Sequence, residues 1–286
     1  MTAPHKTTKD QRTVGRLLVV GGAEDPDENS LHILPHLVEM AGGKKSRILI
    51  CAAPSGEPDR VERIYRKLFK AAGAGEVFEI DVPDRHAVDS QEAEEAVNRA
   101  TAVFFTGGDQ LRLTSLVAGT RFGERVRERL WQEGLVVAGT SAGAAAMSST
   151  MLIAGSGDGT VRRSDIVLAP GLGYWRDTTI DTHFSQRGRV SRLLTLFAQN
   201  PQVLGIGIDE NTAIEVEPGK RFTVLGKNAV YVFDGRVTHS NAPDVGDNEV
   251  LALTDSTVHA LPEGYGFDLQ TKRPILPDGK PIPAKP

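Results

Sequence analysis

The feature that most constrains the fold is an alternation of short apolar runs with helical patterns over the first two thirds of the chain. The apolar runs lie at 16–22, 47–54, 76–82, 102–108 and 135–139. They are apolar or β-branched almost throughout, as expected of strands that are covered on both faces. Helical patterns lie between them at 28–41, 58–72, 90–100, 109–118 and 121–133. Repeated strand–helix–strand units predict an α/β fold, with a mostly parallel sheet and helices on both of its faces.

One of the helical patterns is especially regular. Between residues 58 and 72, apolar side chains recur at three-and-four spacing, at Val61, Ile64, Tyr65, Leu68, Phe69 and Ala72. This periodicity gives a helix one apolar face to pack against a sheet. Pro35 falls inside the pattern at 28–41 and is expected to kink that helix, because proline has no backbone N–H to donate.

The pattern changes after residue 203. Four short strand patterns, VLGIGID, TAIEVE, RFTVLG and NAVYVFDG, are separated by Pro-Gly, Gly-Lys and Asp-Gly turn signals. They predict hairpins, and therefore an antiparallel C-terminal extension of the sheet. No linker separates the two regions, so a single α/β domain is predicted over 16–270. We expect a frayed or disordered N-terminus at 1–15 and an extended or frayed proline-rich tail at 271–286.

Composition excludes several classes of protein. The 286 residues include 33 Lys and Arg against 37 Asp and Glu, which gives a net charge of −4 and argues against a nucleic-acid binder. The single cysteine excludes a disulfide within one chain and a cysteine-based zinc cluster. The first apolar run, Leu17 to Val20, is too short to span a bilayer, and no secretory signal precedes it. We therefore expect a cytoplasmic enzyme without a membrane partner.

The sharpest chemical signal is the segment Gly139-Thr140-Ser141-Ala142-Gly143. It joins an apolar strand pattern to a good helix former, and G-x-S-x-G in that position is typical of a nucleophile elbow. Small neighbours let the backbone turn sharply, and the following helix directs N–H groups at an oxyanion formed there. The alternative is a small-residue turn that packs a helix on a strand. The position of the motif favours a catalytic serine.

A catalytic serine needs a base, and the most suggestive of the seven histidines is His183. It ends the strand pattern TIDTHF, and Gln186, Arg187, Arg189 and Arg192 follow it. Arginine binds carboxylates through two parallel hydrogen bonds, so this cluster suits an anionic ligand, and Arg189 and Arg192 would share one helical face. The alternative is a solvated helix start with ordinary surface arginines.

His32 and His36 are four residues apart on a predicted helix, with glutamates nearby. Because they lack the third ligand of an H-E-x-x-H context, no metal site is predicted.

A carboxylate that could orient the base lies at the end of the apolar run VLGIGI. Asp209 and Glu210 both follow this run, and spacing alone does not choose between them. The carboxyl ends of parallel strands are where such sheets hold their sites. A strand-ending turn residue is the alternative reading of either carboxylate.

Two glycine-rich turns follow other strands. Thr106–Gln110 could supply an oxyanion-hole N–H or cradle a phosphate, but no Gly-Lys-Ser/Thr of a P-loop follows it. Gly21–Asp25 does not match G-x-G-x-x-G, which makes dinucleotide binding improbable. Cys51 lies in an apolar strand and is expected to be a buried core residue.

Together, GTSAGA, TGGDQ, DTHFSQRGR and GIGIDENTA resemble the motifs of the cyanophycinase family, serine exopeptidases related to aspartyl dipeptidase. The likeness runs from VVGGAEDP near the start to HALPEGYGFDL near the end. It implies a fold like that of class I glutamine amidotransferases, which is flavodoxin-like. It also implies a homodimer, and no metal or organic cofactor.

The resemblance also implies roles for individual residues. Ser141 matches the nucleophile, His183 the general base and Glu210 its orienting acid. The backbone N–H groups of Gly108 and Ala142 match the oxyanion hole. Positions matching those used for substrate recognition are Gln110, Asp181, Arg187, Arg189 and Arg192.

The implied substrate is cyanophycin, a polyaspartate backbone that carries arginine on its β-carboxyls, and the implied product is β-aspartyl-arginine. The arginine cluster suits the carboxylates of this polymer, and acidic residues such as Asp181 could suit its guanidinium groups. One alternative is a dipeptidase of short aspartyl or isoaspartyl peptides. A second is an α/β-hydrolase with His239 or His259 as its base. A third is a non-catalytic binding protein in which Ser141 is structural.

Overall fold

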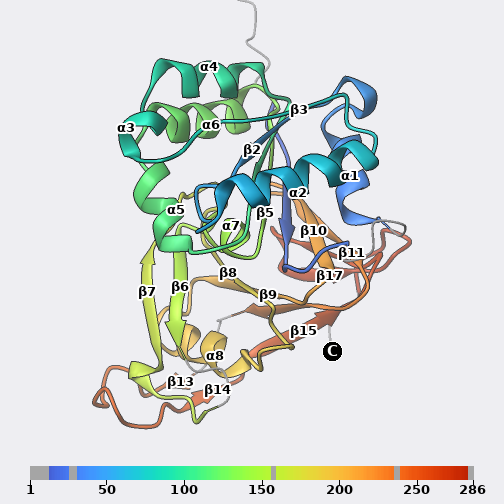
Figure 1. Ribbon diagram of the computed structural model, residues 1–286. Helices are drawn as coiled ribbons and strands as arrows, with labels where there is room; N and C mark the ends of the chain where they lie inside the picture. Colours follow the sequence, from blue (N-terminus) through green and yellow to red (C-terminus); the bar gives the residue numbers. More distant parts are fainter. Residues whose placement is uncertain (1–12, 26–30, 156–158, 235–238, 283–286) are drawn as a thin grey trace, which may run out of the picture.

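Five parallel strands form one side of the larger sheet, as the alternating pattern predicts (Figure 1). The computed structural model describes residues 13–25, 31–155, 159–234 and 239–282. The parallel strands are β1 (Leu17–Val20), β2 (Arg47–Cys51), β3 (Glu76–Glu79), β4 (Ala102–Phe105) and β5 (Val136–Thr140). They are arranged in the order β1-β5-β4-β2-β3, so β5 lies between β1 and β4.

Helices cover both faces of these strands, which confirms the predicted α/β class. They are α1 (Ile33–Met40), the short 3₁₀ turn η1 (Gly43–Lys45), α2 (Pro58–Ala71), α3 (Arg85–Val88), α4 (Gln91–Arg99), α5 (Gln110–Val117) and α6 (Arg121–Gln132). Side chains alternate between the faces of a strand. Leu18 and Val20 pack with α1 and α2, whereas Leu17 and Val19 pack with α4, α5 and α6.

The first helix differs from its prediction. It begins at Ile33 rather than at residue 28, and residues 26–30 lie outside the described residues. The Asp25 carboxylate accepts the backbone N–H groups of His32, Ile33 and Leu34. Pro35 is therefore in the first turn, where a backbone N–H has no acceptor within the helix and its absence costs little.

Four antiparallel strands extend the same sheet beyond β1. They are β10 (Thr212–Glu217), β11 (Arg221–Gly226), β16 (Gly266–Asp268) and β17 (Arg273–Ile275). β10 pairs with both β1 and β11, so the predicted hairpin at 212–226 is present. The full order of this nine-stranded sheet is β17-β16-β11-β10-β1-β5-β4-β2-β3.

Both ends of the domain extend further than expected. β17 lies in the segment expected to be a proline-rich tail, and Ile275 forms a bridge with Pro281. At the other end, Thr13 forms a bridge with Glu133, and Gly15 donates its N–H to the Leu130 carbonyl. Backbone pairing therefore ties both segments to the fold. The remaining parts of these two expectations, residues 1–12 and 283–286, lie outside the described residues.

A second sheet, which the sequence pattern did not reveal, lies below the first (Figure 1). Its strands are β8 (Thr178–Thr182), β9 (Leu204–Ile208), β12 (Val230–Asp234) and β15 (Thr257–Leu261), in the order β15-β12-β9-β8. β8 and β9 are parallel. One face joins the core of the large sheet through Ile180, Ile206 and Val232. On the other face, Phe184 and Phe233 pack with α8 (Val190–Gln199).

The remaining elements are α7 (Ala142–Ala145), β6 (Thr150–Gly155), η2 (Arg163–Asp165), β7 (Ile166–Pro170), β13 (His239–Ser240) and β14 (Leu253–Thr254). β6 pairs with β7, and β13 with β14. Cys51 is buried in the core, and burial raises the pKa of its thiol to about 12. None of the helices in the described parts of the chain is both long and apolar enough to cross a membrane.

Candidate active site

Three strand ends from the two sheets meet at one place. Ser141 follows β5 of the nine-stranded sheet, which is the expected position for a functional residue in a parallel sheet. His183 follows β8, and Glu210 lies two residues beyond the end of β9. Because β8 and β9 are parallel neighbours, His183 and Glu210 leave the small sheet side by side.

The three side chains form a continuous chain of hydrogen bonds. Ser141 Oγ lies 2.8 Å from His183 Nε2. His183 Nδ1 lies 2.7 Å from Glu210 Oε1. The structure thus brings together the serine, histidine and glutamate that the resemblance singles out. This geometry can pass a proton from the hydroxyl to the imidazole and stabilise the resulting charge.

Ser141 occupies a strained turn between β5 and α7. Its φ of 51° and ψ of −114° lie in a region that non-glycine residues rarely adopt. Close packing on either side requires glycines. A Cβ on Gly139 would lie 2.6 Å from the Gly143 carbonyl carbon, and a Cβ on Gly143 would lie 2.3 Å from the Phe105 carbonyl oxygen. The G-x-S-x-G segment therefore has the sharp geometry of a nucleophile elbow.

The imidazole of His183 is largely buried, with 12% of its side chain exposed. Burial lowers the pKa of this imidazole, and the nearby Arg187 and Arg189 guanidinium groups lower it further. The hydrogen bond to Glu210 opposes that shift by stabilising the protonated ring. The net lowering favours a neutral imidazole at neutral pH, and a neutral imidazole can accept a proton.

Geometry distinguishes the two carboxylates that spacing could not separate. Asp209 is buried, and its carboxylate accepts the backbone N–H of Ser185 at 2.8 Å and that of Ala229 at 3.3 Å. It therefore holds two loops together and does not face His183. Glu210 directs its carboxylate at the imidazole, while its own N–H donates to Gln186 Oε1 at 3.0 Å.

The predicted oxyanion donors belong to two segments next to the serine. The Gly107–Gly108 turn follows β4, the strand beside β5, and a Cβ on Gly107 would lie 4.0 Å from Ser141 Oγ. Ala142 is the first residue of α7, where backbone N–H groups have no acceptor within the helix. Gln110 begins α5, and its Nε2 donates to the Leu152 carbonyl of β6 at 3.0 Å.

Of the predicted recognition residues that follow or precede His183, some are paired inside the protein and one is exposed. Arg189 and Arg192 share a face as expected, but that face turns inward to the buried Asp181. Arg189 Nη1 lies 2.9 Å from Asp181 Oδ1, and Arg192 Nε lies 3.2 Å from Oδ2. Burial raises the pKa of the Asp181 carboxyl, and the two guanidinium groups oppose that rise. Asp181 is 3% exposed in its side chain, so it differs from the expectation of a ligand for substrate guanidinium groups.

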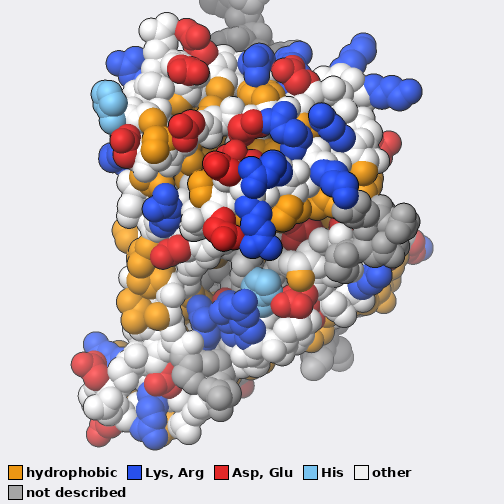
Figure 2. All heavy atoms as spheres, viewed as in Figure 1, with side chains coloured by type: hydrophobic (Ala, Val, Ile, Leu, Met, Phe, Trp, Pro, Cys, Tyr) orange, Lys and Arg blue, Asp and Glu red, His pale blue; other side chains and the backbone are white. Residues whose placement is uncertain are grey.

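Arg187 is the exposed member of the basic cluster. Its guanidinium group lies close enough to His183 to lower the pKa of the imidazole. Figure 2 shows Lys and Arg side chains gathered beside a histidine near the middle of this face. The arrangement favours anionic ligands.

Sequence reasoning missed two residues in the turn after β1. A Cβ on Gly22 would lie 2.3 Å from His183 Cε1, so this glycine leaves room for the ring. Glu24 is buried and accepts hydrogen bonds from Thr140 Oγ1 at 2.6 Å and from the Tyr65 hydroxyl at 2.5 Å. The paired glycines at the end of the strand are a signal in the sequence, but they do not by themselves indicate a contact with His183.

The other histidines have different surroundings. His32 lies 2.7 Å from Glu263, and His36 lies 2.7 Å from Glu215, so the two rings turn to separate carboxylates. Over the described ranges, no three His, Cys, Asp or Glu side chains gather closely enough to hold a metal ion. His259 packs against Phe267 in β16, with ring centres 5.6 Å apart.

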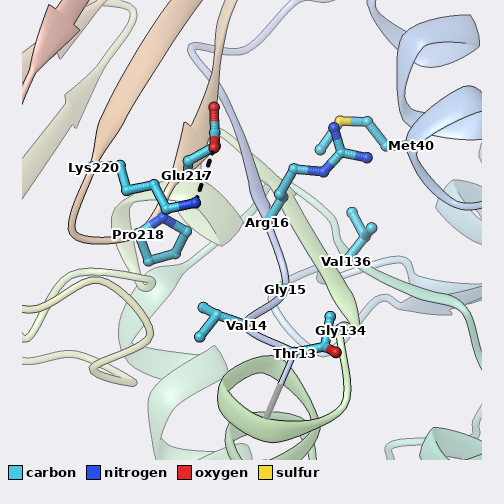
Figure 3. Close-up of a pocket in the computed structure, with 10 residues that line it drawn as sticks. All are labelled: Thr13, Val14, Gly15, Arg16, Met40, Gly134, Val136, Glu217, Pro218 and Lys220. Carbon is cyan, nitrogen blue, oxygen red and sulfur yellow. Dashed lines mark ion pairs between the residues drawn. The ribbon is translucent and has the colours of Figure 1, made fainter. Parts of the chain in front are cut away.

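A separate pocket of about 310 Å³ lies at the other end of the central strands, away from Ser141 (Figure 3). Arg16 and Val136 line it where β1 and β5 begin, whereas Ser141 follows the end of β5. Lys220 and Glu217 form an ion pair at its rim, with Nζ and Oε2 3.5 Å apart. This pocket is therefore not part of the serine site.

Comparison with known proteins finds relatives that match most of the chain. The sequence is 38% identical over 268 residues to a cyanophycinase from Nostoc sp., covering 93% of this chain and 89% of the relative. It is 36% identical over 260 residues to a cyanophycinase from Geminocystis herdmanii, covering 91% and 95% of the two chains.

Solved structures share the fold. A peptidase from an acI-B1 actinobacterium superposes with a TM-score of 0.65 at 22% identity, covering 90% of this chain and 97% of the other. A putative peptidase E from Listeria monocytogenes gives 0.51 at 15% identity, with 76% and 100% covered. The sequence model of peptidase family S51 matches residues 17–224. The chain therefore belongs to peptidase family S51.

Proposed function

We propose that this chain is a cyanophycinase, a serine exopeptidase that hydrolyses cyanophycin to β-aspartyl-arginine dipeptides. The observation that carries the proposal is the unbroken hydrogen-bond chain from Ser141 through His183 to Glu210, at 2.8 and 2.7 Å. The substrate is inferred from relatives named cyanophycinase, which are 35–38% identical over about nine tenths of the chain.

In the proposed mechanism, Ser141 Oγ attacks the α-peptide carbonyl between two aspartates of the polymer backbone. His183 Nε2 takes the hydroxyl proton and then delivers it to the leaving amine. We assign the other ring proton to Nδ1, from where it donates to Glu210 and fixes the ring orientation. Water, activated by the same histidine, then hydrolyses the acyl-enzyme and releases Ser141.

The backbone N–H groups of Gly108 and Ala142 are proposed to stabilise the negative charge on the tetrahedral intermediate. Two features support this assignment. Gly108 belongs to the turn after β4 whose Gly107 lies near Ser141, and Ala142 begins α7, where the first N–H groups lack acceptors within the helix. Developing charge at that position also benefits from the positive end of the helix.

The basic cluster is proposed to hold the aspartate carboxylates of the polymer. Arg187 is exposed and available for direct contact, and Gln110 at the start of α5 is a further recognition candidate. The inward pairing of Arg189 and Arg192 with Asp181 supports different roles for the acidic and the basic side chains. Asp181 orients the two arginines, and their charge attracts and aligns the anionic substrate.

The proposal is tested by incubating insoluble cyanophycin with wild-type protein and with the Ser141→Ala variant. We expect β-aspartyl-arginine, identified by mass spectrometry, from the wild type alone. Cleavage of short aspartyl peptides without attack on the polymer would assign the chain as a dipeptidase instead. A well-folded wild type that cleaves neither would overturn the hydrolase assignment.

A homodimer in the cytoplasm remains part of the proposal, on the strength of the resemblance. Light scattering after size exclusion should give twice the 30.8 kDa of one chain. Fractionation of host cells tests the location.

A further inference from the structure

Val20, the last residue of β1, and the turn that follows it, Gly21–Asp25, bond through their backbone to Ser141, to His183 and to the residue after Glu210. Three successive carbonyl groups, of Val20, Gly21 and Gly22, accept the backbone N–H groups of Ser141, His183 and Asn211 at 3.1, 2.9 and 2.8 Å. Asn211 is the neighbour of Glu210 in the chain. One short segment of the large sheet is therefore bonded to the nucleophile's strand end and to both strand ends of the small sheet.

Within this turn, Gly22 lies directly against the imidazole. A Cβ built on Gly22 would lie 2.3 Å from His183 Cε1 and 2.5 Å from Nε2. Nε2 is the atom that faces Ser141 Oγ. Because a side chain cannot occupy that space together with the ring, the bare backbone of Gly22 forms one wall of the position that the ring occupies.

The turn is itself anchored on both sides. Glu24 accepts the hydroxyl groups of Thr140 and Tyr65, which joins the turn to β5 and to α2. Asp25 accepts the first N–H groups of α1, and its own N–H donates to Asn211 Oδ1 at 3.1 Å. Burial also raises the pKa of Glu24, while its two hydroxyl donors oppose the rise. These contacts make the turn a rigid support rather than a free loop.

We propose that Gly22 is a positioning residue, which aligns His183 Nε2 with Ser141 by presenting bare backbone to the imidazole. The inference rests on the proposed role of His183 as the general base. It does not depend on the identity of the substrate, because the alignment concerns only protein atoms. In this proposal, the turn after β1 holds the two sheets together next to Ser141 Oγ and His183 Nε2.

The test compares Gly22→Ala with Gly42→Ala. Both glycines have a positive φ, 103° and 108°, which an alanine rarely adopts, so backbone strain is present in both variants. A Cβ on Gly42 meets no atom closer than 3.9 Å, whereas a Cβ on Gly22 meets the ring. Two rates are measured: turnover of cyanophycin, and labelling of Ser141 by a fluorophosphonate, which needs no knowledge of the natural substrate.

We expect Gly22→Ala to lower kcat and the labelling rate by roughly 100-fold, as misplacement of a catalytic group by about 1 Å does, with KM changed less than about threefold. Gly42→Ala should stay within about threefold of wild type in both rates. In a His183→Ala background, whose residual activity remains measurable, adding Gly22→Ala should have almost no effect.

Three results would overturn the inference. The first is a Gly22→Ala enzyme as active as Gly42→Ala. The second is a loss that persists in full when His183 is already alanine, because the glycine would then act through another group. The third applies if Gly22→Ala does not fold. Because the added methyl clashes with the imidazole, the double variant Gly22→Ala/His183→Ala should then fold. A double variant that also fails to fold contradicts the inference. Should cyanophycin not be the substrate, the labelling rates still decide the matter.

Discussion

The two sheets contribute to the site in different ways. The nine-stranded sheet carries Ser141 at the end of β5, a buried strand that lies between β1 and β4. The four-stranded sheet carries His183 and Glu210 on the paired strands β8 and β9. The base and its orienting acid thus share one support, and the nucleophile has another. Alignment of the three depends on how the two sheets meet.

Because the nucleophile and the base lie on different sheets, their alignment is most sensitive to substitutions where the sheets meet. Within the small sheet, parallel pairing fixes the imidazole relative to the carboxylate. Within the large sheet, the elbow fixes the serine hydroxyl. At the junction the two sheets share an apolar core, and the turn after β1 adds backbone bonds from Gly21 to His183 and from Gly22 to Asn211. A change at this junction should separate serine from base without disturbing either sheet.

The largest effect is expected when a triad side chain is removed. Ser141→Ala and His183→Ala should each lower kcat by about 10⁴-fold or more, and Glu210→Gln somewhat less. Because the residues act as a unit, the double variant Ser141→Ala/His183→Ala should be no slower than either single variant. Losses that multiply in the double variant would mean that the two sheets contribute independently. Urea unfolding should show near-wild-type stability for all three single variants.

A large effect on stability is expected inside the small sheet. Asp181→Asn removes the counter-charge of the buried Arg192 and of Arg189, which should lower the free energy of unfolding by about 3 kcal/mol. A matched control is Glu124→Gln, which breaks a largely exposed pair with Arg127 and should cost less than about 1 kcal/mol. Chemical denaturation compares the two. Equal losses would show that the Asp181 cluster is not a structural centre of this sheet.

A smaller effect is expected on the pH dependence of kcat/KM. The pKa of His183 is lowered, so its neutral form persists to lower pH and the acid limb should fall below about pH 6.5. Arg187→Gln removes one positive charge that lowers this pKa. The pKa should therefore rise, and the acid limb should move to higher pH. The remote variant Arg121→Gln should leave the limb in place, and a shift to lower pH in Arg187→Gln would contradict the assignment of the base.

The large sheet was well predicted because its pattern is local. Strands such as 47–51 are apolar after their first residue, and helices such as 58–71 show one apolar face, so neighbouring residues specify each element. The small sheet was missed because β9 and β12 have the same short pattern as β10 and β11. Which strands pair depends on packing between distant segments, and no local feature distinguishes the two pairs.

The site residues divide in the same way. The G-x-S-x-G segment carries its own geometric signal, whereas choosing Glu210 over Asp209 needed the resemblance. The burial of Asp181 could not be foreseen, because an alternating strand does not reveal that both of its faces are covered. The contact of Gly22 with His183 joins segments 161 positions apart and has no signature in the sequence beyond the glycine itself.

The most direct test of the account is to map a fluorophosphonate adduct by mass spectrometry while peptidase activity is followed in the same sample. We predict one adduct per chain, on Ser141, with activity falling in proportion to labelling. We also predict that His183→Ala slows the labelling by orders of magnitude, because the base from the small sheet activates the serine of the large sheet. An adduct on another residue, or equally fast labelling of Ser141 without His183, would contradict the claim that the two sheets form one catalytic unit.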